Sequence, residues 1–169
     1  MFHINILKGD ILMEKTNVMR ILDQKKINYK SHSYVDTDAI SGIEVAKVLN
    51  QDPKRVFKTL VTVSASNKNY VFVIPVEKEL NLKKAAKAVG EKKIEMLKSK
   101  DLLPLTGYVH GGCSPIGMKK FFPTIIDQSA AQYDTIIFSA GKIGYQVELS
   151  LEDLKKVIAF SLGDVCEEV

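Results

Sequence analysis

The chain has 169 residues, of which 46% are hydrophobic and 26% are charged, and its formal net charge is +4 at pH 7. This length suits one well-packed domain and is short for two. No apolar run approaches the roughly 18 to 20 residues that span a bilayer, and no secretory signal pattern is visible, so we expect a cytoplasmic protein without a membrane partner. The modest positive charge permits an anionic partner without requiring one.

The first element that the sequence predicts is a helix in MEKTNVMRIL. Thr16 or Asn17 is placed to cap its start, and Val18, Ile21 and Leu22 share one face. A domain that begins close to this helix is therefore expected.

The residues before Met13 fit no later pattern. The KGD stretch at 8–10 can be encoded by a purine run that resembles a bacterial ribosome-binding site, a short spacer before the Met13 codon. We therefore expect one domain over 13–169, preceded by an extension over 1–12 that is a translated leader from a misassigned start. A purine-poor gene sequence at this place would remove the argument.

The next segment predicts an extended piece, a helix and a β-hairpin. The extended piece is INYKSHSYVD. Ser41 and Glu44 have the spacing of a capping box, and the helix that they open closes before Asp52-Pro53. RVFKTLVTV, at 55–63, reads as a strand, and YVFVIPV pairs back to it across a polar turn.

The rest of the chain predicts short elements. LNLKKAAKAVG is a helix that ends at Gly90, KKIEML is a strand or a helix extension, and a helical turn after Ser99 stops near Pro104. Strands are expected in YVHGG, FPTIID, DTIIFSA and YQVEL, followed by a last helix from Ser150. Short strands without regular helix alternation predict an α+β domain around a mixed, curved sheet.

Lys58 lies in the middle of the apolar strand RVFKTLVTV. Alternation places it on one face with Val56 and Leu60. If this face is turned inward, the ammonium needs a partner or a polar cavity, which would make it a functional group. If the strand is an edge, the lysine discourages aggregation and its stem packs along the surface.

Two glycine-containing stretches are candidates for substrate contact. HGGCSPIG, at 110–117, can bring the main chain close to a substrate and point amide groups at a polarised carbonyl, or it can be a tight connection between strands. Cys113 within it lacks a His–Asp pair in register, so a buried structural thiol is favoured over a nucleophile. SAGKIG, at 139–144, is a hairpin turn.

A lysine-rich segment follows the hairpin. Lys83, Lys84 and Lys87 share one face of the predicted helix, where they would contact nucleic-acid phosphates or form an ordinary solvated surface. No aromatic residues are interleaved with them, so contacts to the nucleic-acid backbone are favoured over base stacking. Cys113 and Cys166 are too far apart in sequence to suggest a disulfide framework or a zinc site, and we expect neither a metal nor a cofactor.

Taken together, these stretches resemble the YbaK/EbsC-like aminoacyl-tRNA deacylases, which are related to the editing insertion of prolyl-tRNA synthetase. The matching pieces follow the family order from residue 13 to residue 168, and they are HSYVD, RVFKTLV, LNLKKAAKAVGEKKIEM, TGYVHGGCSPIG and FSAGKIGYQVEL. The resemblance implies a single α+β domain with a curved, mixed, barrel-like sheet and flanking helices. It further implies a trans-editing hydrolase that deacylates Cys-tRNA(Pro), and possible contact with prolyl-tRNA synthetase.

The resemblance also assigns the site. Lys58 would line the pocket as the catalytic cation, which favours its inward, functional interpretation. Tyr34, Thr59, Gly111, Gly112, Ser114 and Ser139 would bind the substrate, with looser support for His32. Members of the family are thought to use the substrate's own thiol as nucleophile, and the chain agrees in showing no convincing triad.

Two alternatives stay open on the sequence. The first is a deacylase for alanine or another small amino acid on tRNA, because pocket width decides the amino acid and the sequence does not show width. The second is a non-catalytic module of the same fold that binds tRNA or a synthetase. Lys58 and the intact GGCSPIG motif favour an active enzyme.

Overall fold

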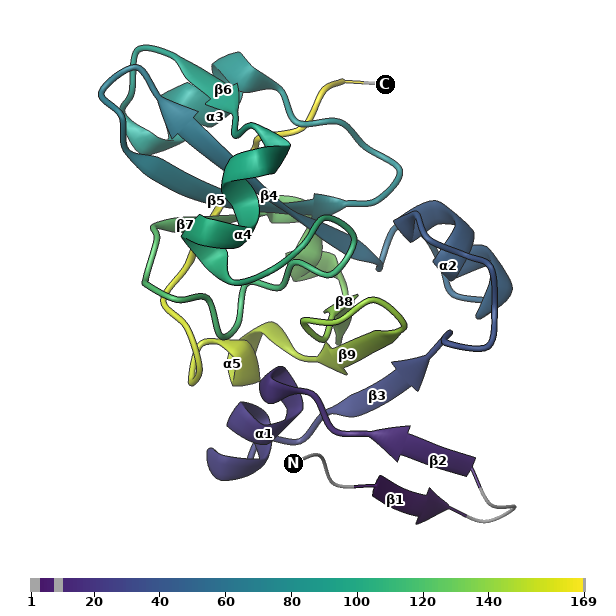
Figure 1. Ribbon diagram of the computed structural model, residues 1–169. Helices are drawn as coiled ribbons and strands as arrows, with labels where there is room; N and C mark the ends of the chain where they lie inside the picture. The colour runs from purple at the N-terminus through teal and green to yellow at the C-terminus, as the bar shows by residue number, and fades with distance from the viewer. Residues whose placement is uncertain (1–3, 8–10, 169) are drawn as a thin grey trace.

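The computed structural model describes residues 4–7 and 11–168. Its helices are α1 (Asn17–Gln24), α2 (Gly42–Val48), α3 (Leu82–Val89), α4 (Ser99–Thr106) and α5 (Leu151–Leu154), with a 3-10 helix η1 (Gln128–Gln132). Its strands are β1 (Ile4–Leu7), β2 (Ile11–Glu14), β3 (Lys30–Ser33), β4 (Phe57–Ser64), β5 (Asn69–Pro75), β6 (Ile94–Met96), β7 (Thr124–Asp127), β8 (Ile136–Ser139), β9 (Tyr145–Leu149) and β10 (Ser161–Gly163). Figure 1 shows their arrangement. No helix in the described ranges is long and apolar enough to cross a membrane.

The larger sheet has five strands in the order β10-β7-β5-β4-β6. β4 and β5 form the predicted antiparallel hairpin. Its turn contains Asn67 in the left-handed region (φ 63°), which the short polar side chain of asparagine tolerates. β7 pairs in parallel with both β5 and β10, so the sheet is mixed, as the sequence predicts.

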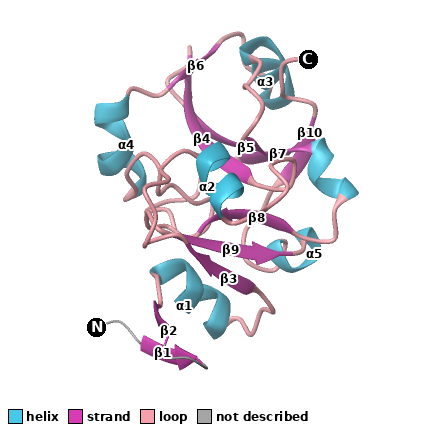
Figure 2. Cartoon of the chain, turned by 90° about the vertical axis from the view of Figure 1, so that its right-hand side faces the viewer, coloured by secondary structure: helices cyan, strands magenta, loops and turns pink. Residues whose placement is uncertain are grey.

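The smaller sheet has three antiparallel strands in the order β3-β9-β8. It meets the larger sheet where Val56 and Ile137 form a parallel bridge, and where the Ile137 amide donates to the Arg55 carbonyl at 2.9 Å. Figure 2 shows the two sheets one above the other. The mixed α+β prediction is confirmed. The barrel-like sheet is wrong, because β10 and β6 stay outer strands of their ladder and this bridge does not close it.

Most of the apolar core lies between the two sheets. Val61 and Val73 of the larger sheet pack in the same cluster as Phe138 and Val147 of the smaller one. Full burial of one such side chain contributes about 1.5 to 3 kcal/mol. α3 packs on the opposite face of the larger sheet through its central alanines, within a separate cluster.

The helix starts follow the predicted caps. The Thr16 hydroxyl accepts the amide of the residue three positions on in α1, and Ser41 and Glu44 form the complete capping box of α2. α3 begins after Asn81, whose side chain caps its first turn, and ends at Gly90 in the left-handed conformation (φ 72°).

Two local predictions differ from the structure, and one short strand near the C-terminus was missed. YVHGG is a loop, because Gly111 takes a positive φ of 87° and the Gly112 amide turns back to the Val109 carbonyl, a geometry that no strand continues. The helix after Ser99 continues through Pro104 and ends at Thr106. β10 was not predicted, because it is short and mostly exposed.

The boundary predicted at Met13 falls inside β2, which pairs with β1 from Ile4–Glu14 to Leu7–Ile11. β2 therefore belongs to both predicted segments. The KGD stretch at 8–10 lies outside the described residues, so the misassigned start stays a prediction.

Candidate functional site

Lys58 lies in a part of β4 that has a hydrogen-bonded neighbour strand on one edge only. On one side Lys58 pairs with Ile74 of β5. On the other side, the ladder to β6 covers only Thr62–Ser64 and the bridge to β8 ends at Val56, so the described strands leave the stretch between them unpaired. β4 is thus an inner strand of its sheet with a local opening beside Lys58.

The Lys58 ammonium has a weak ionic partner. Its side chain is 30% exposed, and its Nζ lies 3.8 Å from Oε1 of Glu79, which is 83% exposed. Such exposed pairs stabilise a fold by about 0 to 1 kcal/mol. The cation is therefore available to an anionic or polarised ligand.

Ser139 is the last residue of β8. Lys58 and Ser139 each lie two residues after the parallel bridge between Val56 and Ile137. Because side chains alternate along a strand, Lys58 projects from the same face of its strand as Val56, and Ser139 from the same face as Ile137. The Ser139 hydroxyl accepts the Gly141 amide at 3.1 Å, which fixes the start of the 139–144 turn.

Tyr34 extends the pairing of β3 with β9. Its amide donates to the Gly144 carbonyl at 2.8 Å, one step beyond the Ser33–Tyr145 pair. Its side chain is 6% exposed and packs against Val45 of α2. The structure thus brings Tyr34 to the turn that follows Ser139, as a largely buried wall.

The glycine-rich loop and the 139–144 turn contact each other through their backbones. A Cβ on Gly112 would lie 3.2 Å from the Ile143 amide nitrogen, closer than most side chains tolerate. Gly111 has a positive φ of 87°, which other L-residues rarely adopt. Both glycines are therefore required for this loop to lie against the turn that carries Ser139.

Two residues of the loop face inward. Ser114 is 0% exposed, and its hydroxyl accepts the Ile116 amide at 3.3 Å. Cys113 is also buried, and burial raises the pKa of its thiol to about 12. Ser114 therefore shapes the loop, and the substrate contact predicted for it stays a prediction. Cys113 is a neutral thiol, which is a poor nucleophile.

Thr59 lies on the opposite face of β4 from Lys58. Its neighbours on that face, Phe57 and Val61, belong to the core cluster that contains Cys113. The Thr59 hydroxyl oxygen is buried and has no hydrogen-bond partner among the described residues. Such an atom costs free energy, so it calls for a structural or functional reason.

A polar network that the sequence did not reveal lies beside the Val56–Ile137 bridge, where Glu148 is the β9 partner of Ile137. Glu148 of β9 accepts hydrogen bonds from the Thr135 hydroxyl at 2.5 Å and pairs with His32 Nε2 at 2.8 Å. Arg55 donates to the Thr135 hydroxyl at 2.6 Å and lies 3.5 Å from Glu148. The network ties β3, β8 and β9 to the residues that lead into β4.

The charge state of Glu148 follows from this network. Burial acts to raise its pKa, but the hydrogen bonds from Thr135 and His32 and the charges of His32 and Arg55 act against it, and the pKa is lowered overall. Glu148 is therefore ionised at neutral pH. His32, predicted with looser support as a pocket residue, acts here as a partner of this carboxylate.

Gln146 is a further residue that the sequence reasoning missed. It is 4% exposed, lies opposite Ser139 in the β8–β9 ladder, and accepts from Gln51 Nε2 at 2.8 Å. Gln51 follows α2, so this bond holds the end of that helix over the smaller sheet. A sequence signal was available, because Gln146 is a polar residue inside the otherwise largely apolar strand YQVEL.

The lysines of α3 lie on the side of the larger sheet that faces away from β8 and β9 (Figure 1). Lys58 projects from this same face, because its neighbour Leu60 and its ladder partner Ile74 pack with the α3 alanines. Lys83 and Lys87 are exposed, whereas Lys84 pairs with Asp164 at 3.1 Å and Glu168 at 3.2 Å. In the described ranges, no group of three or more His, Cys, Asp or Glu side chains is arranged to hold a metal ion.

Comparison with known proteins gives a consistent result. The model of the aminoacyl-tRNA editing domain family matches residues 37–157. An Enterococcus faecalis protein named "Putative Cys-tRNA(Pro)/Cys-tRNA(Cys) deacylase EbsC" is 52% identical over 140 residues, which cover 82% of this chain and 85% of that protein. A proline–tRNA ligase of Endomicrobium trichonymphae is 25% identical over 134 residues, which cover 79% of this chain and 23% of the ligase.

A solved structure has the same fold. It is titled "Crystal structure of a putative trans-editing enzyme for prolyl tRNA synthetase", and it superposes with a TM-score of 0.76 at 20% identity, covering 90% of this chain and 99% of its own. At this identity the likeness concerns the fold. The family model and the Enterococcus relative together establish that this chain belongs to the aminoacyl-tRNA editing domain family.

Proposed function

We propose that this protein is a trans-editing hydrolase that removes cysteine from mischarged Cys-tRNA(Pro). The observation that carries the proposal is the partly exposed, weakly paired Lys58 ammonium beside the unpaired stretch of β4. The name of the Enterococcus faecalis relative supports the choice of substrate. The match to part of a proline–tRNA ligase supports prolyl-tRNA synthetase as a partner.

The reaction needs stabilisation of negative charge on the ester carbonyl oxygen. The Lys58 ammonium is partly exposed and weakly paired, so it can approach that oxygen as charge develops. Backbone amides near Gly112 would add donors, and Tyr34 and Ser139 would position the aminoacyl-adenosine. The substrate contact predicted for Thr59 stays a prediction, because its side chain lies on the opposite face of β4 from Lys58.

The attacking group in this proposal belongs to the substrate. The cysteine thiol attacks its own ester carbonyl, the bond to the ribose oxygen breaks, and the thiol proton leaves to that oxygen. The products are tRNA with a free hydroxyl and a cyclic thiolactone, which water later opens. Burial of Cys113, with its raised pKa, supports this route over a protein nucleophile.

A panel of charged tRNAs tests the proposal. Purified protein is incubated with proline tRNA that carries cysteine, alanine or proline, and the loss of each ester is followed above the spontaneous rate. We expect rapid loss of cysteine and slow loss of the other two. Faster loss of alanine would assign the protein to the small-amino-acid deacylases, and no loss of any ester would leave a binding module.

A further inference from the structure

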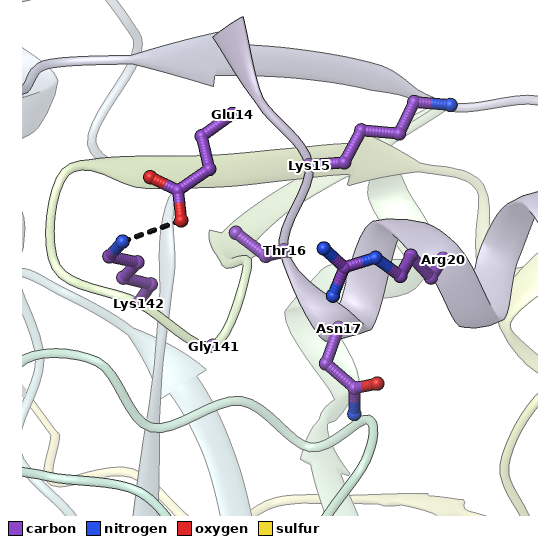
Figure 3. Close-up of a pocket in the computed structure, with 7 residues that line it drawn as sticks. All are labelled: Glu14, Lys15, Thr16, Asn17, Arg20, Gly141 and Lys142. Carbon is purple, nitrogen blue, oxygen red and sulfur yellow. Dashed lines mark hydrogen bonds and ion pairs between the residues drawn. The ribbon is translucent and has the colours of Figure 1, made fainter. Parts of the chain in front are cut away.

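A shallow cavity of about 300 Å³ lies between the 139–144 turn and the start of α1 (Figure 3). Its walls include Glu14 at the end of β2, Thr16 before α1, and Asn17 and Arg20 of α1, with Gly141 and Lys142 from the turn. The turn is closely packed here, since a Cβ on Gly141 would lie 2.9 Å from a methyl group of Val18. The cavity is thus built on the turn that carries Ser139.

Positive charge faces this cavity. The Arg20 guanidinium points into it between Thr16 and Asn17, and the Lys142 ammonium contacts Glu14 at 2.7 Å (Figure 3). Lys15 extends away from the other lining side chains and pairs with Asp23. Lys142 keeps Glu14 as its partner, and the Arg20 guanidinium presents further donors to the same cavity (Figure 3).

The chemistry of these two cations suits a phosphate group. A guanidinium offers a planar fork of donors that matches two phosphate oxygens. A lysine ammonium has three donors, so Lys142 can keep Glu14 and still bind an oxygen of a ligand. The Lys142 side chain is 52% exposed, which leaves it accessible.

The cavity is also close to the proposed ester site. Ser139 and Lys142 are separated by three residues, which span at most about 11 Å even when fully extended. If the esterified end of an RNA strand lies at Ser139, the phosphates of the nucleotides next to that end would be within reach of this turn.

We propose that this cavity binds a backbone phosphate of the RNA strand next to its esterified end, with Arg20 and Lys142 as the donors. The inference rests on the proposed function for the identity of the strand. It places one contact of the acceptor end on the α1 side of the turn, separate from the exposed lysines of α3 and from the opening beside Lys58.

Binding of an uncharged RNA hairpin tests the cavity without requiring catalysis. The probe is a fluorescent acceptor-stem hairpin of proline tRNA that ends in CCA, and its affinity is measured by anisotropy at low salt. Arg20→Gln and Lys142→Gln are each expected to weaken binding about tenfold, the loss typical of one charge-assisted hydrogen bond. Glu14→Gln should tighten binding, because it removes the repelling carboxylate and releases Lys142.

Lys68→Gln is the matched control, because it removes one charge from the exposed turn between β4 and β5. Its affinity should stay within about twofold of the wild type. If Arg20→Gln and Lys142→Gln bind like Lys68→Gln, the inference is overturned. Lys142 lies on an exposed turn, so its variant keeps the test valid if Arg20→Gln fails to fold.

The same hairpin charged with cysteine separates this inference from the proposed function. If the wild type does not hydrolyse the ester but the variants show the expected binding pattern, the cavity assignment stands and the proposed function fails. If the ester is hydrolysed and Arg20→Gln binds like the control, the proposed function stands and the cavity assignment fails.

Discussion

At the scale of single residues, the charge of Lys58 and the neutrality of Cys113 set the proposed chemistry. Lys58 is a cation whose partner, Glu79, is almost fully exposed. Cys113 is a thiol kept protonated by its apolar surroundings. In the proposed chemistry, Lys58 would therefore stabilise the negative charge that develops on the ester oxygen, and Cys113 would not act as a thiolate nucleophile.

Replacing Lys58 should separate activity from stability. Lys58→Ala is expected to lower kcat/KM for Cys-tRNA(Pro) by about 100-fold or more, the loss typical of removing one donor to a developing oxyanion. The free energy of unfolding should change by less than about 1 kcal/mol, because the pair with Glu79 is exposed. Deacylation and urea unfolding measure the two effects.

Lys54→Ala is the matched control for this variant, since Lys54 is an exposed lysine just before β4. It should keep wild-type activity. A Lys58→Ala protein with full turnover would remove Lys58 from the mechanism, and one that unfolds would show that its role is structural.

Burial of Cys113 predicts a pH effect on stability. The folded-state pKa of about 12 lies above the ordinary value of 9.0. The stabilisation from keeping the thiol neutral is therefore complete below about pH 9 and is lost as the pH rises toward about 12. Urea midpoints at pH 8 and pH 10 should fall more for the wild type than for Cys113→Ala, and equal declines would contradict the assignment.

At the scale of elements, the site depends on how two sheets are held at one bridge. Lys58 and Ser139 come from different sheets that meet at the Val56–Ile137 pair. The network of Arg55, Thr135 and Glu148 lies beside this bridge. We infer that it fixes the spacing between the two strands that carry the site.

Removal of the Glu148 carboxylate should loosen this junction. Glu148→Ala is expected to cost about 1 to 3 kcal/mol, because it leaves the Thr135 hydroxyl and His32 Nε2 without their partner. Glu148→Gln should cost less, since its amide oxygen can still accept from Thr135. Urea unfolding at pH 7 gives both values, and equal stabilities of all three proteins would contradict the role of the network.

The same carboxylate predicts an acid dependence. The pKa of Glu148 is lowered in the folded protein, so its contribution to stability is present above the ordinary carboxylate range and is lost as the pH falls through the folded-state pKa. The wild type should therefore lose more stability on acidification than Glu148→Gln does. Parallel urea midpoints from pH 7 to pH 3 would argue against this linkage.

The lysines of α3 are not equivalent in a tRNA-binding test. Lys83→Gln together with Lys87→Gln should weaken binding and flatten the plot of log K against log salt by up to about two, if each contacts one phosphate. Lys84→Gln should have a smaller effect, because Asp164 and Glu168 already neutralise that lysine. An unchanged slope in the double variant would return this face to ordinary solvated surface.

At the scale of the whole molecule, local signals predicted the elements and long-range pairing decided the site. The capping box at Ser41 and the left-handed Gly90 end are set by neighbouring residues, so the sequence revealed them. The open side of β4 at Lys58 and the placement of the two sheets that carry Lys58 and Ser139 depend on a bridge between positions 81 residues apart (137 − 56). No local pattern encodes such a pairing.

The same distinction explains the errors. The curved sheet was expected to close, but closure depends on partners for β6 and β10 that no segment supplies in the described ladder. Arg55 and Glu148 look like surface charges in the sequence, and only the fold brings them to Thr135. At Lys58 the residues alone left two interpretations open, and the functional one favoured by the resemblance to the editing family stays a prediction.

The most direct test of the account is the first product formed from Cys-tRNA(Pro) by the Cys113→Ala, Cys166→Ala protein. Because the substrate's thiol is the proposed nucleophile, this protein should release a cyclic thiolactone at near the wild-type rate, and S-methylation of the esterified cysteine should stop the reaction. Mass spectrometry of quenched reactions identifies the product. Loss of activity in this variant, or an acyl group trapped on Cys113 of the wild type, would contradict the account.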